Sequence, residues 1–570
     1  MLNGFKAWHQ KHRTLPSAPC RLRLRHVPHP DQNLQVAATA AATRVVRNSA
    51  SLTAVEYVEP EERLLTLSDL LAAGAASGLA ARLRKLTGVR IAADCAVQQL
   101  QALRQCTGLT RLGIDGTALQ DCSAEQGHEA TVELKAALQG MRSLTCLHLC
   151  SWQLLSEGAV TTLASALQPL TQLQHLHIVY SRLGAAGVAA LAPALSGMRG
   201  LQTLDVCYNL LDRAEGAQAL CALLGAVPGL THLDVGGNGL GEKGAALLAP
   251  VLRGMTCLQT LNLSFTLLHD MGIADLAPAL AALPHLHTLN LSDNRLGARA
   301  VSALQPVLAR EGSPLRNLDL SNQLKLEGAL ALAAGLSTAT QLRELRLYNM
   351  ELGDVGWVVA LAPALSCLAA SLRLLELGYD SVDNAGLAAL AEALPKLTRL
   401  TCLKARGFFS PAAMVTISPA LMGMRRLQVL DLHRAAMGAD GTAALAAVLP
   451  ALAGSLMHLN LTDCSIDEKT AANTLAPALA QAIALVRLYL HCNVLGSRAA
   501  EWLVPVVSAL PHLREVGLYS CKLGVQGCMA VVHALKDRDG ARVHLGRNGV
   551  TSGSTEGDEL CNMAGIHVCL

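Results

Sequence analysis

A pattern of about 28 residues recurs along most of the chain, and this repeat constrains the fold more than any other feature. Its consensus is Leu-x-x-Leu-x-Leu-x-x-Asn-x-Leu, and after a first unit of 35 residues the units are spaced by 27–30 residues. A repeat of this length cannot bury its own apolar face, so successive units must stack on one another. The clearest units begin at Leu109, Leu144, Leu173, Leu201, Leu230, Leu258, Leu286, Leu315, Leu342, Leu372, Leu400, Leu427, Leu456, Leu485, Leu513 and Gly540, and less regular ones at Leu52 and Leu86.

Each unit is expected to form a strand, a turn and a helix. In the unit that begins at Leu230, apolar residues alternate through Val235, which is typical of a half-buried strand. Asn238 follows at the turn, and a helical run opens at Gly241 and continues to Leu252. Because an Asn amide can bond neighbouring backbone groups, we expect it to tie one unit to the next. Stacking then places a parallel sheet on one wall and helices on the other.

This pattern resembles the leucine-rich repeat, and the spacing is similar to that of the ribonuclease-inhibitor subtype. The resemblance covers about residues 86–550. It implies an α/β solenoid, a right-handed βα horseshoe with the parallel sheet on the concave face and helices outside. The turn Asn is present at Asn209, Asn238, Asn294, Asn493 and Asn548. It is replaced at Thr117, Trp152, Ser181, Thr266, Gln323, Met350, Asp380, Phe408, Ala435, Cys464 and Cys521, so the Asn ladder is expected to be imperfect.

Recurrent prolines oppose regular helices in these units. A proline inside a helix removes a hydrogen bond and costs about 3 kcal/mol or more. We therefore expect short, irregular outer helices that break at the same point of each turn. The prolines occur about 20 residues after the start of their units, at Pro193, Pro250, Pro278, Pro306, Pro363, Pro419, Pro477 and Pro505.

The chain divides into four regions on its sequence. Residues 1–51 form a basic N-terminal segment, either a targeting sequence or a flexible tail, with a helix expected at 34–47. Residues 52–108 contain degenerate repeats and an N-terminal cap, in which 67–85 is expected to be helical. Residues 109–550 carry the regular repeats, and residues 551–570 form a C-terminal cap or tail.

Charge and cysteine content restrict the class of protein. The first 30 residues carry six basic and no acidic residues, and the remainder has 40 basic against 43 acidic ones, which disfavours a nucleic-acid partner. The 17 cysteines include no CxxC pair and follow no signal peptide, which indicates free thiols and a cytoplasmic protein. An organelle, addressed by the basic start, and a cilium are the alternatives. Two 18-residue uncharged stretches, 355–372 and 407–424, are interpreted as repeat helices and not as membrane spans.

The large polar residues gather at strand positions that point away from the core. Counting the first Leu of a unit as position one, these are positions three, five, seven and eight. Six of the seven tyrosines occupy them, and Tyr is enriched in protein interfaces. A preference of Tyr for strands is the alternative explanation. We therefore predict a protein-binding concave face that contains Tyr180, Tyr208, Phe265, Tyr348, Tyr379, Tyr489 and Tyr519, together with the charged residues Asp205, Asp234, Lys404 and Arg406.

The charged residues of this face suggest a split in sign. Position five is acidic to neutral in the middle units, and Lys404, Arg406, Arg434 and Arg487 add positive charge later. Such a split would orient a partner; a solvated polar surface is the alternative. A cluster of Cys and His on adjacent strands is interpreted as surface residues, not as a zinc site, because it lacks the spacing of a zinc module. Its members are Cys146, His148, Cys150, His175, His177, Asp205 and Cys207.

No sequence signature of catalysis is present, and no cofactor is expected. The stretch that starts at Gly236 fails as a phosphate-binding loop because Glu242 stands where Lys is needed. The prediction is a non-catalytic scaffold that binds a protein partner. The Ran GTPase-activating proteins have similar repeats, so an activator of a small GTPase is the alternative, although no catalytic residue of that family can be matched here. Membership of a large assembly is a third hypothesis.

Overall fold

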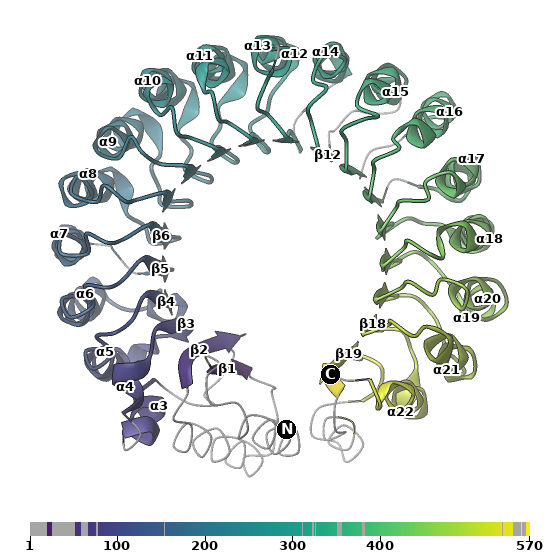
Figure 1. Ribbon diagram of the computed structural model, residues 1–570, viewed down its shortest axis with the longest axis horizontal. Coiled ribbons are helices and arrows are strands. Elements are labelled where there is room, and N and C mark those ends of the chain that lie inside the picture. Colours follow the sequence, from purple (N-terminus) through teal and green to yellow (C-terminus); the bar gives the residue numbers. More distant parts are fainter. Residues whose placement is uncertain are drawn as a thin grey trace. The chain divides into compact units, whose positions relative to one another are not determined.

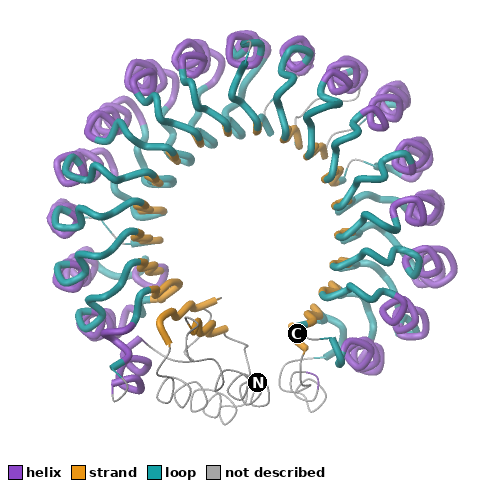
Figure 2. Tube along the Cα trace, viewed as in Figure 1, coloured by secondary structure: helices purple, strands orange, loops and turns teal. Residues whose placement is uncertain are grey.

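The computed structural model describes residues 20–25, 52–58, 67–75 and 78–569, apart from residues 153, 155, 311, 322–323, 325, 350–355, 379–381, 408, 539, 551–559 and 561–565. The chain forms two compact units, which meet in the sequence between Asn294 and Arg295. In each unit strands and helices alternate along the chain, with the strands on the inner side of the curved stack and the helices on the outer side (Figure 1, Figure 2). The expected repeat solenoid is confirmed in both units.

The N-terminal unit is a parallel sheet in which each strand pairs with the next strand of the sequence. From β4 onward equivalent positions pair in register, so Leu204 of one strand lies beside Leu233 of the next, and Leu233 beside Leu261. The pairings of β1 with β2 and of β3 with β4 each contain a register shift. The strands are β1 (Cys20–Arg25), β2 (Leu52–Val58), β3 (Lys85–Arg90), β4 (Arg111–Asp115), β5 (Cys146–Cys150), β6 (His175–Val179), β7 (Thr203–Asp205), β8 (His232–Asp234), β9 (Thr260–Asn262) and β10 (Thr288–Asn290). Its helices are α3 (Leu67–Gly74), α4 (Leu79–Arg82), α5 (Ala96–Leu103), α6 (Ala124–Leu138), α7 (Glu157–Leu167), α8 (Gly184–Leu195), α9 (Arg213–Ala226), α10 (Gly241–Gly254) and α11 (His269–Ala282).

The C-terminal unit repeats this arrangement. Its strands are β11 (Asn317–Asp319), β12 (Glu344–Tyr348), β13 (Leu374–Gly378), β14 (Cys402–Arg406), β15 (Val429–Asp431), β16 (His458–Asn460), β17 (Arg487–Tyr489), β18 (Glu515–Gly517), β19 (Ala541–His544) and β20 (Ile566–Cys569). Its helices are α12 (Ala298–Ala303), α13 (Gln305–Leu308), α14 (Leu326–Leu336), α15 (Trp357–Cys367), α16 (Asn384–Ala393), α17 (Pro411–Met422), α18 (Gly438–Val448), α19 (Glu468–Thr470), α20 (Ala476–Leu479), α21 (Ala500–Ala509) and α22 (Gly524–Leu535).

The core of each unit lies between the sheet and the helices. In the repeat that begins at Leu230, the first, fourth and sixth positions (Leu230, Leu233 and Val235) are buried, and so are Leu248 and Leu252 of α10. A strand alternates its side chains between two faces, so the residues between these positions face away from the core. This pattern, repeated along the sheet, makes a layer of Leu against a layer of helical Leu and Ala. Among the described residues, no helix covers the other face of the sheet (Figure 2).

The turn asparagines form the expected ladder of hydrogen bonds between successive repeats of about 28 residues. Asn238 is fully buried, and its Oδ1 accepts a hydrogen bond from the backbone N–H of Asn209 at 2.8 Å. Its Nδ2 donates to the carbonyl of Val206, also in the preceding unit, at 2.9 Å. Asn294, Asn493 and Asn548 repeat these contacts. Where Cys replaces Asn, the thiol keeps part of the pattern: Cys464 donates to the carbonyl of Leu432 at 3.2 Å, and Cys521 to that of Leu490 at 3.1 Å.

The expectation that the helices break at proline is wrong for most of the repeats. Helices α10 and α11 run for 14 residues through Pro250 and Pro278, and α8, α15, α17 and α21 also contain a proline. These prolines face solvent, so water can bond the carbonyl that lies one turn earlier and has lost its N–H partner. The expectation holds at Pro306, where α12 ends and α13 begins, and near Pro477, where a π-helical turn (Ala471–Leu475) interrupts the helix.

Several expectations lie partly or wholly outside the described residues. These are the helix at 34–47, Tyr379, the replaced turn positions Gln323, Met350, Asp380 and Phe408, and most of 551–570. The region expected to be helical at 67–85 forms α3 and α4 before β3 begins at Lys85. The uncharged stretches 355–372 and 407–424 contain the repeat helices α15 and α17. Within the described part of the chain, every helix is too short or too polar to cross a bilayer.

Candidate functional site

The inner face of each sheet presents the side chains that do not enter the core. In β8, for example, His232 is exposed, Leu233 is buried and Asp234 is half-buried. Positions three, five and seven of every unit therefore share one face, and position eight lies at the turn directly after the strand. We call this surface the inner face, and describe it separately for each unit.

In the N-terminal unit the inner face carries an aromatic patch at the carboxyl end of the strands. The rings of Tyr180 and Tyr208 stack in parallel, with centroids 4.3 Å apart and planes inclined by 6°. Phe265 lies beside Tyr208 at a centroid distance of 6.4 Å. Tyr180 is 50% exposed and Phe265 is 48% exposed. We call Tyr180, Tyr208 and Phe265 the tyrosine patch.

A glycine makes room for the patch. Tyr180, Tyr208 and Phe265 all occupy position eight, where the backbone is left-handed, with φ between 53° and 55°. Gly237 holds the same position in the unit between Tyr208 and Phe265, with φ of 70°. A Cβ atom on Gly237 would lie 2.4 Å from the ring of Tyr208. The Tyr208 ring therefore occupies the space that a side chain at residue 237 would fill.

Two carboxylates lie side by side next to the patch. Asp205 and Asp234 are direct neighbours in the register of β7 and β8, and we call them the acid pair. Each also caps its own strand: the backbone N–H of Cys207 donates to Asp205 Oδ1 at 3.1 Å, and that of Gly236 to Asp234 Oδ1 at 2.9 Å. Asn262, Asn290, Asp319, Asp431 and Asn460 make the same contact in their units. Position five thus has a structural role that explains why Asp and Asn recur there.

The two carboxylates of the acid pair differ from each other in their electrostatic surroundings. Burial, and the negative charge of Asp205, raise the pKa of Asp234 above its ordinary value despite hydrogen bonds from Asn262 and Gly236. Although burial opposes it, hydrogen bonds from His177 and Cys207 hold the pKa of Asp205 below its usual range. Burial and the neighbouring Asp205 raise the pKa of the Cys207 thiol, which favours its protonated, donating form.

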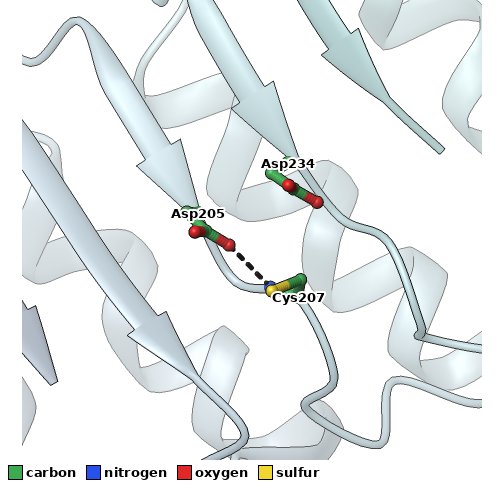
Figure 3. Close-up of side chains that lie close together, drawn as sticks. All are labelled: Asp205, Cys207 and Asp234. Atoms are coloured by element: carbon green, nitrogen blue, oxygen red, sulfur yellow. Dashed lines mark hydrogen bonds between the residues drawn. The ribbon is translucent and has the colours of Figure 1, made fainter. Parts of the chain in front are cut away.

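Among the described residues, the only side chains close enough to share a metal ion are Asp205, Cys207 and Asp234, whose ligand atoms lie within 4.8 Å of one another (Figure 3). The wider Cys and His cluster is not gathered around one point. His148 contacts His177 at a ring distance of 5.2 Å, and His175 bonds Thr203 at 2.9 Å. Asp205 bonds His177 and the backbone N–H of Cys207, and Asp234 bonds Asn262 and the backbone N–H of Gly236.

In the C-terminal unit the inner face carries a network of ion pairs around Glu376, a carboxylate that is only 4% exposed. Lys404 Nζ lies 3.2 Å from Glu376 Oε2, and Arg406 Nη1 lies 3.3 Å from Glu376 Oε1. Arg346 approaches Glu376 at 3.6 Å, and Arg406 also pairs with Asp431 at 2.9 Å. The sequence did not reveal these partners, although the register places Glu376 beside Lys404 in adjacent strands. The positive residues predicted for binding are therefore matched by acids of the chain itself.

A second group of rings lies further along the C-terminal unit. Tyr489 stacks on His491 at 5.5 Å, His491 lies 5.9 Å from His544, and Arg547 covers the ring of Tyr519 at 5.4 Å. His491 Nδ1 accepts a hydrogen bond from the backbone N–H of Tyr519 at 2.9 Å. Glu515 pairs with His544 at 3.1 Å. The histidines were missed in the sequence because only the strand register reveals that they share rows with the tyrosines.

Burial and hydrogen bonding set the protonation of this group. Burial, with the nearby His544, lowers the pKa of His491 to about 4. Hydrogen bonds to Cys569 and Glu515 raise the pKa of His544. Burial, with a hydrogen bond to Glu515, raises the pKa of Tyr489 to about 12. Of the remaining predicted residues, Tyr348 is half-buried at the end of β12.

Comparisons with known proteins bear on the fold. A family model described as Leucine Rich repeat matches residues 230–249 and 282–304. No curated protein matches the chain. An internalin from Listeria monocytogenes is 16% identical, with 69% of this chain and 93% of that chain covered and a TM-score of 0.38. The yeast Rad7 and Elc1 complex contains a chain that is 16% identical, with 78% and 92% covered and a TM-score of 0.41.

Proposed function

We propose that this chain, which is a leucine-rich repeat protein, is a non-catalytic scaffold that binds a protein partner on the inner face of its sheets. The observation that carries the proposal is the tyrosine patch. The rings of Tyr180 and Phe265 are about half exposed, and Tyr208 lies between exposed and buried. All three residues are nevertheless held by ring contacts and by the left-handed turns at position eight. A surface ordered before binding does not pay the entropy of ordering its side chains, so it contributes more to affinity.

The chemistry of the inner face supports a protein partner. Tyrosines offer large apolar area with a polar end, and such residues dominate the energy of many protein interfaces. The inner face of the N-terminal unit also has carboxylates beside the rings, which would repel a phosphate backbone. We propose the ribonuclease-inhibitor-like subtype for the repeats, because the units are 27–30 residues long and most contain a helix of ten or more residues.

The cellular setting and the alternative activity remain proposals too. The cysteines whose side chains the structure describes are free thiols, which supports a reducing compartment such as the cytoplasm.

An activator of a small GTPase is the second hypothesis for the function. No feature of the described residues favours it over binding alone.

The test is affinity purification from native lysate with three full-length baits. One is wild type; one carries Tyr180→Ser, Tyr208→Ser and Phe265→Ser. The matched control carries Val132→Ser, Leu247→Ser and Met271→Ser, three exposed apolar residues on the helices of the same unit. Circular dichroism first confirms that all three baits are folded.

We expect at least one protein to be recovered by the wild type and the helix control, and to fall tenfold or more with the inner-face variant. If the inner-face variant retains every partner of the wild type, binding does not use the tyrosine patch and the proposal is wrong. If a small GTPase is the protein lost, its rate of GTP hydrolysis with and without the chain decides the alternative.

A further inference from the structure

A groove of about 750 Å³ runs along the edge of the C-terminal unit where the strands begin. It is formed mainly by four successive loops that lead from a helix to the next strand, residues 423–428, 453–457, 480–486 and 510–514. The tyrosine patch belongs to the other unit and lies at the opposite, carboxyl ends of its strands. The groove is therefore a separate surface, and what it binds goes beyond the proposed function.

Backbone hydrogen bonds fix the floor of the groove. The N–H of Met457 donates to the carbonyl of Gln428 at 2.8 Å, and the N–H of Val486 donates to the carbonyl of Met457 at 2.8 Å. The N–H of Arg514 continues the series to the carbonyl of Val486, also at 2.8 Å. These bonds connect all four loops. The floor is thus ordered in the free chain, which favours the binding of a ligand.

The middle of the groove is apolar and open to solvent. Met457, Ala484 and Val486 line it. Met457 is 46% exposed, and Ile483, the neighbour of Ala484 in the chain, is 53% exposed. Large apolar side chains that are exposed close together are typical of a surface that another molecule covers. The floor therefore offers a contact for an apolar side chain of a ligand.

The two ends of the groove are basic. Arg425 and Arg426 line one end, and His512 and Arg514 line the other. None of the four loops contains an Asp or a Glu. Arg425 and Arg426 are exposed, and neither guanidinium has a hydrogen bond or ion pair with a described residue. Arg514 does have another interaction within the chain, so we assign the main anchoring role to Arg425 and Arg426.

Arginines on the inner face of the same unit differ in this respect. Arg434 lies 3.6 Å from the carboxylate of Asp463, and Arg487 lies 3.5 Å from that of Glu515. Each of these guanidinium groups has an acid of the chain beside it. The positive charge at the Arg425 end of the groove is instead available to an anion from outside the chain.

We propose that this groove binds an extended acidic segment of a protein. One carboxylate of the segment would lie against Arg425 and Arg426, and an apolar side chain would lie on Met457. A second carboxylate would reach the loop at 510–514. The first and last loops are three strand spacings apart, roughly 14 Å, which an extended chain covers in about four residues. Alternate side chains of such a chain share one face, so the expected pattern is acid-x-apolar-x-acid.

An acidic protein segment fits the groove better than a nucleic acid does. Proteins that bind single-stranded nucleic acid stack the bases on aromatic side chains, and His512 is the one ring among the described lining residues. The apolar floor between two basic ends instead matches an apolar residue between two acids. Guanidinium groups also suit carboxylates, because they can donate two parallel hydrogen bonds to one carboxylate.

The test measures the binding of three labelled, end-capped peptides to the full chain by fluorescence anisotropy at 0.15 M salt. The first peptide, Ser-Glu-Ser-Leu-Ser-Glu-Ser, has the proposed pattern. The second replaces its Leu with Ser, and the third replaces both Glu with Lys. We expect the first peptide to bind about threefold or more tightly than the second, and the third not to bind. Raising the salt to 0.5 M should weaken the first peptide severalfold, because ion pairs are screened.

Three variants assign the site. Arg425→Gln with Arg426→Gln should weaken the first peptide by about three- to tenfold. The matched control is Arg343→Gln with Arg373→Gln, which removes two exposed arginines from equivalent loops that do not line the groove, and it should leave binding unchanged. Met457→Ser should lower the affinity for the first peptide to about that for the second, and should not change the affinity for the second.

Circular dichroism checks that each variant is folded. If Met457→Ser is not folded, the comparison of the first and second peptides on the wild type measures the same apolar contact. The inner-face triple variant Tyr180→Ser, Tyr208→Ser and Phe265→Ser should bind the first peptide as the wild type does. The groove and the proposed function are thereby tested separately, because loss of peptide binding in that variant would place the peptide on the inner face and overturn the inference.

Three further results would overturn the inference. Equal losses in the two double-arginine variants would show only nonspecific attraction to positive charge. Equal affinity for the first and second peptides would remove the role of the floor. Tighter binding of a ten-residue oligothymidylate than of the first peptide, lost with Arg425→Gln and Arg426→Gln, would assign the groove to a nucleic acid.

Discussion

Asn238 shows how a single side chain can hold two repeat units together. Its amide accepts from two backbone N–H groups of the preceding repeat, those of Asn209 and Leu211, and donates to the carbonyl of Val206 in that repeat. The residue is fully buried. Substituting Ala removes these bonds and leaves buried backbone groups unpaired, at about 1–3 kcal/mol for each group. The ladder is therefore a large contributor to the stability of each interface between units.

We predict that Asn238→Ala lowers the free energy of unfolding by about 2–4 kcal/mol, as measured by urea denaturation. The control is Asn262→Ala, which removes an amide from the half-exposed position five of the next unit. We expect a loss of about 1 kcal/mol there, because water can replace the lost bonds. Similar losses in the two variants would contradict a special role for the buried ladder.

His491 is a residue whose protonation affects stability in acid. Its pKa in the folded chain is about 4, below its ordinary value of 6.5, because the ring is partly buried and lies next to His544. Between pH 6.5 and pH 4 the unfolded chain therefore binds more protons at this site than the folded chain, so its contribution to stability falls as the pH falls. Protonation would also remove the acceptor for the N–H of Tyr519.

We predict that His491→Phe, which keeps a ring against Tyr489, reduces the loss of stability between pH 6.5 and pH 4.5 by on the order of 1 kcal/mol, a value lowered for partial exposure. Urea midpoints at several pH values measure this. His544 acts in the opposite sense, because its pKa is raised, and it is present in both proteins. The exposed loop variant His512→Gln should follow the wild type; an unchanged slope in His491→Phe would refute the assignment.

At the scale of the element, the helices tolerate proline on one face only. Pro250 lies within the continuous helix α10 and is exposed, whereas Leu248 and Leu252 beside it are buried. The proline removes one intrahelical bond on the side where water can replace it. Pro306 differs, because it stands at the start of α13, where an N–H has no helical partner in any case.

This difference predicts opposite results for two identical substitutions. Pro250→Ala should raise the free energy of unfolding by about 1–2 kcal/mol, since it restores a helical bond at some cost in the entropy of the unfolded chain. Pro306→Ala should be neutral or destabilising by up to about 1 kcal/mol. Thermal and urea denaturation measure both. A destabilising Pro250→Ala would show that the helix requires the proline.

At the scale of the whole molecule, each unit is a stack in which a strand contacts its two neighbours. Among the described residues each strand pairs with the strands before and after it in the sequence. Stability in such proteins is approximately a sum of repeat and nearest-neighbour terms. A local defect should therefore destabilise the adjacent repeats more than distant ones. Two buried leucines, Leu233 in the N-terminal unit and Leu488 in the C-terminal unit, provide equivalent sites for a test.

We predict that Leu233→Ala costs about 2–5 kcal/mol and that hydrogen exchange rises most in β7, β8 and β9, with a smaller change at β4 of the same unit. Leu488→Ala should act in the same way on β16, β17 and β18, and less on β12. Hydrogen-exchange mass spectrometry resolves these segments. A uniform increase in hydrogen exchange across the whole N-terminal or C-terminal unit would mean that this unit opens in one cooperative step.

The sequence alone was sufficient for the repeat, the strand–turn–helix order, the buried Leu positions and the Asn ladder. These features depend on residues that are close in sequence or that recur at a fixed spacing, so their periodicity carries the information. The same periodicity placed Tyr180, Tyr208 and Phe265 on one face. The prediction that helices break at the prolines was wrong for most repeats, because a helix can continue through a proline whose side faces water.

Only the tertiary structure decided which inner-face residues are matched by the chain itself. Lys404 and Arg406 could be recognised as basic from the sequence, but their pairing with Glu376 depends on the register of adjacent strands and on the direction of long side chains. The space left by Gly237 for Tyr208 likewise depends on a contact between units. Periodicity determines which face a residue occupies, whereas charge compensation and stacking are contacts between residues about 28 apart, and those appear only when the units are stacked.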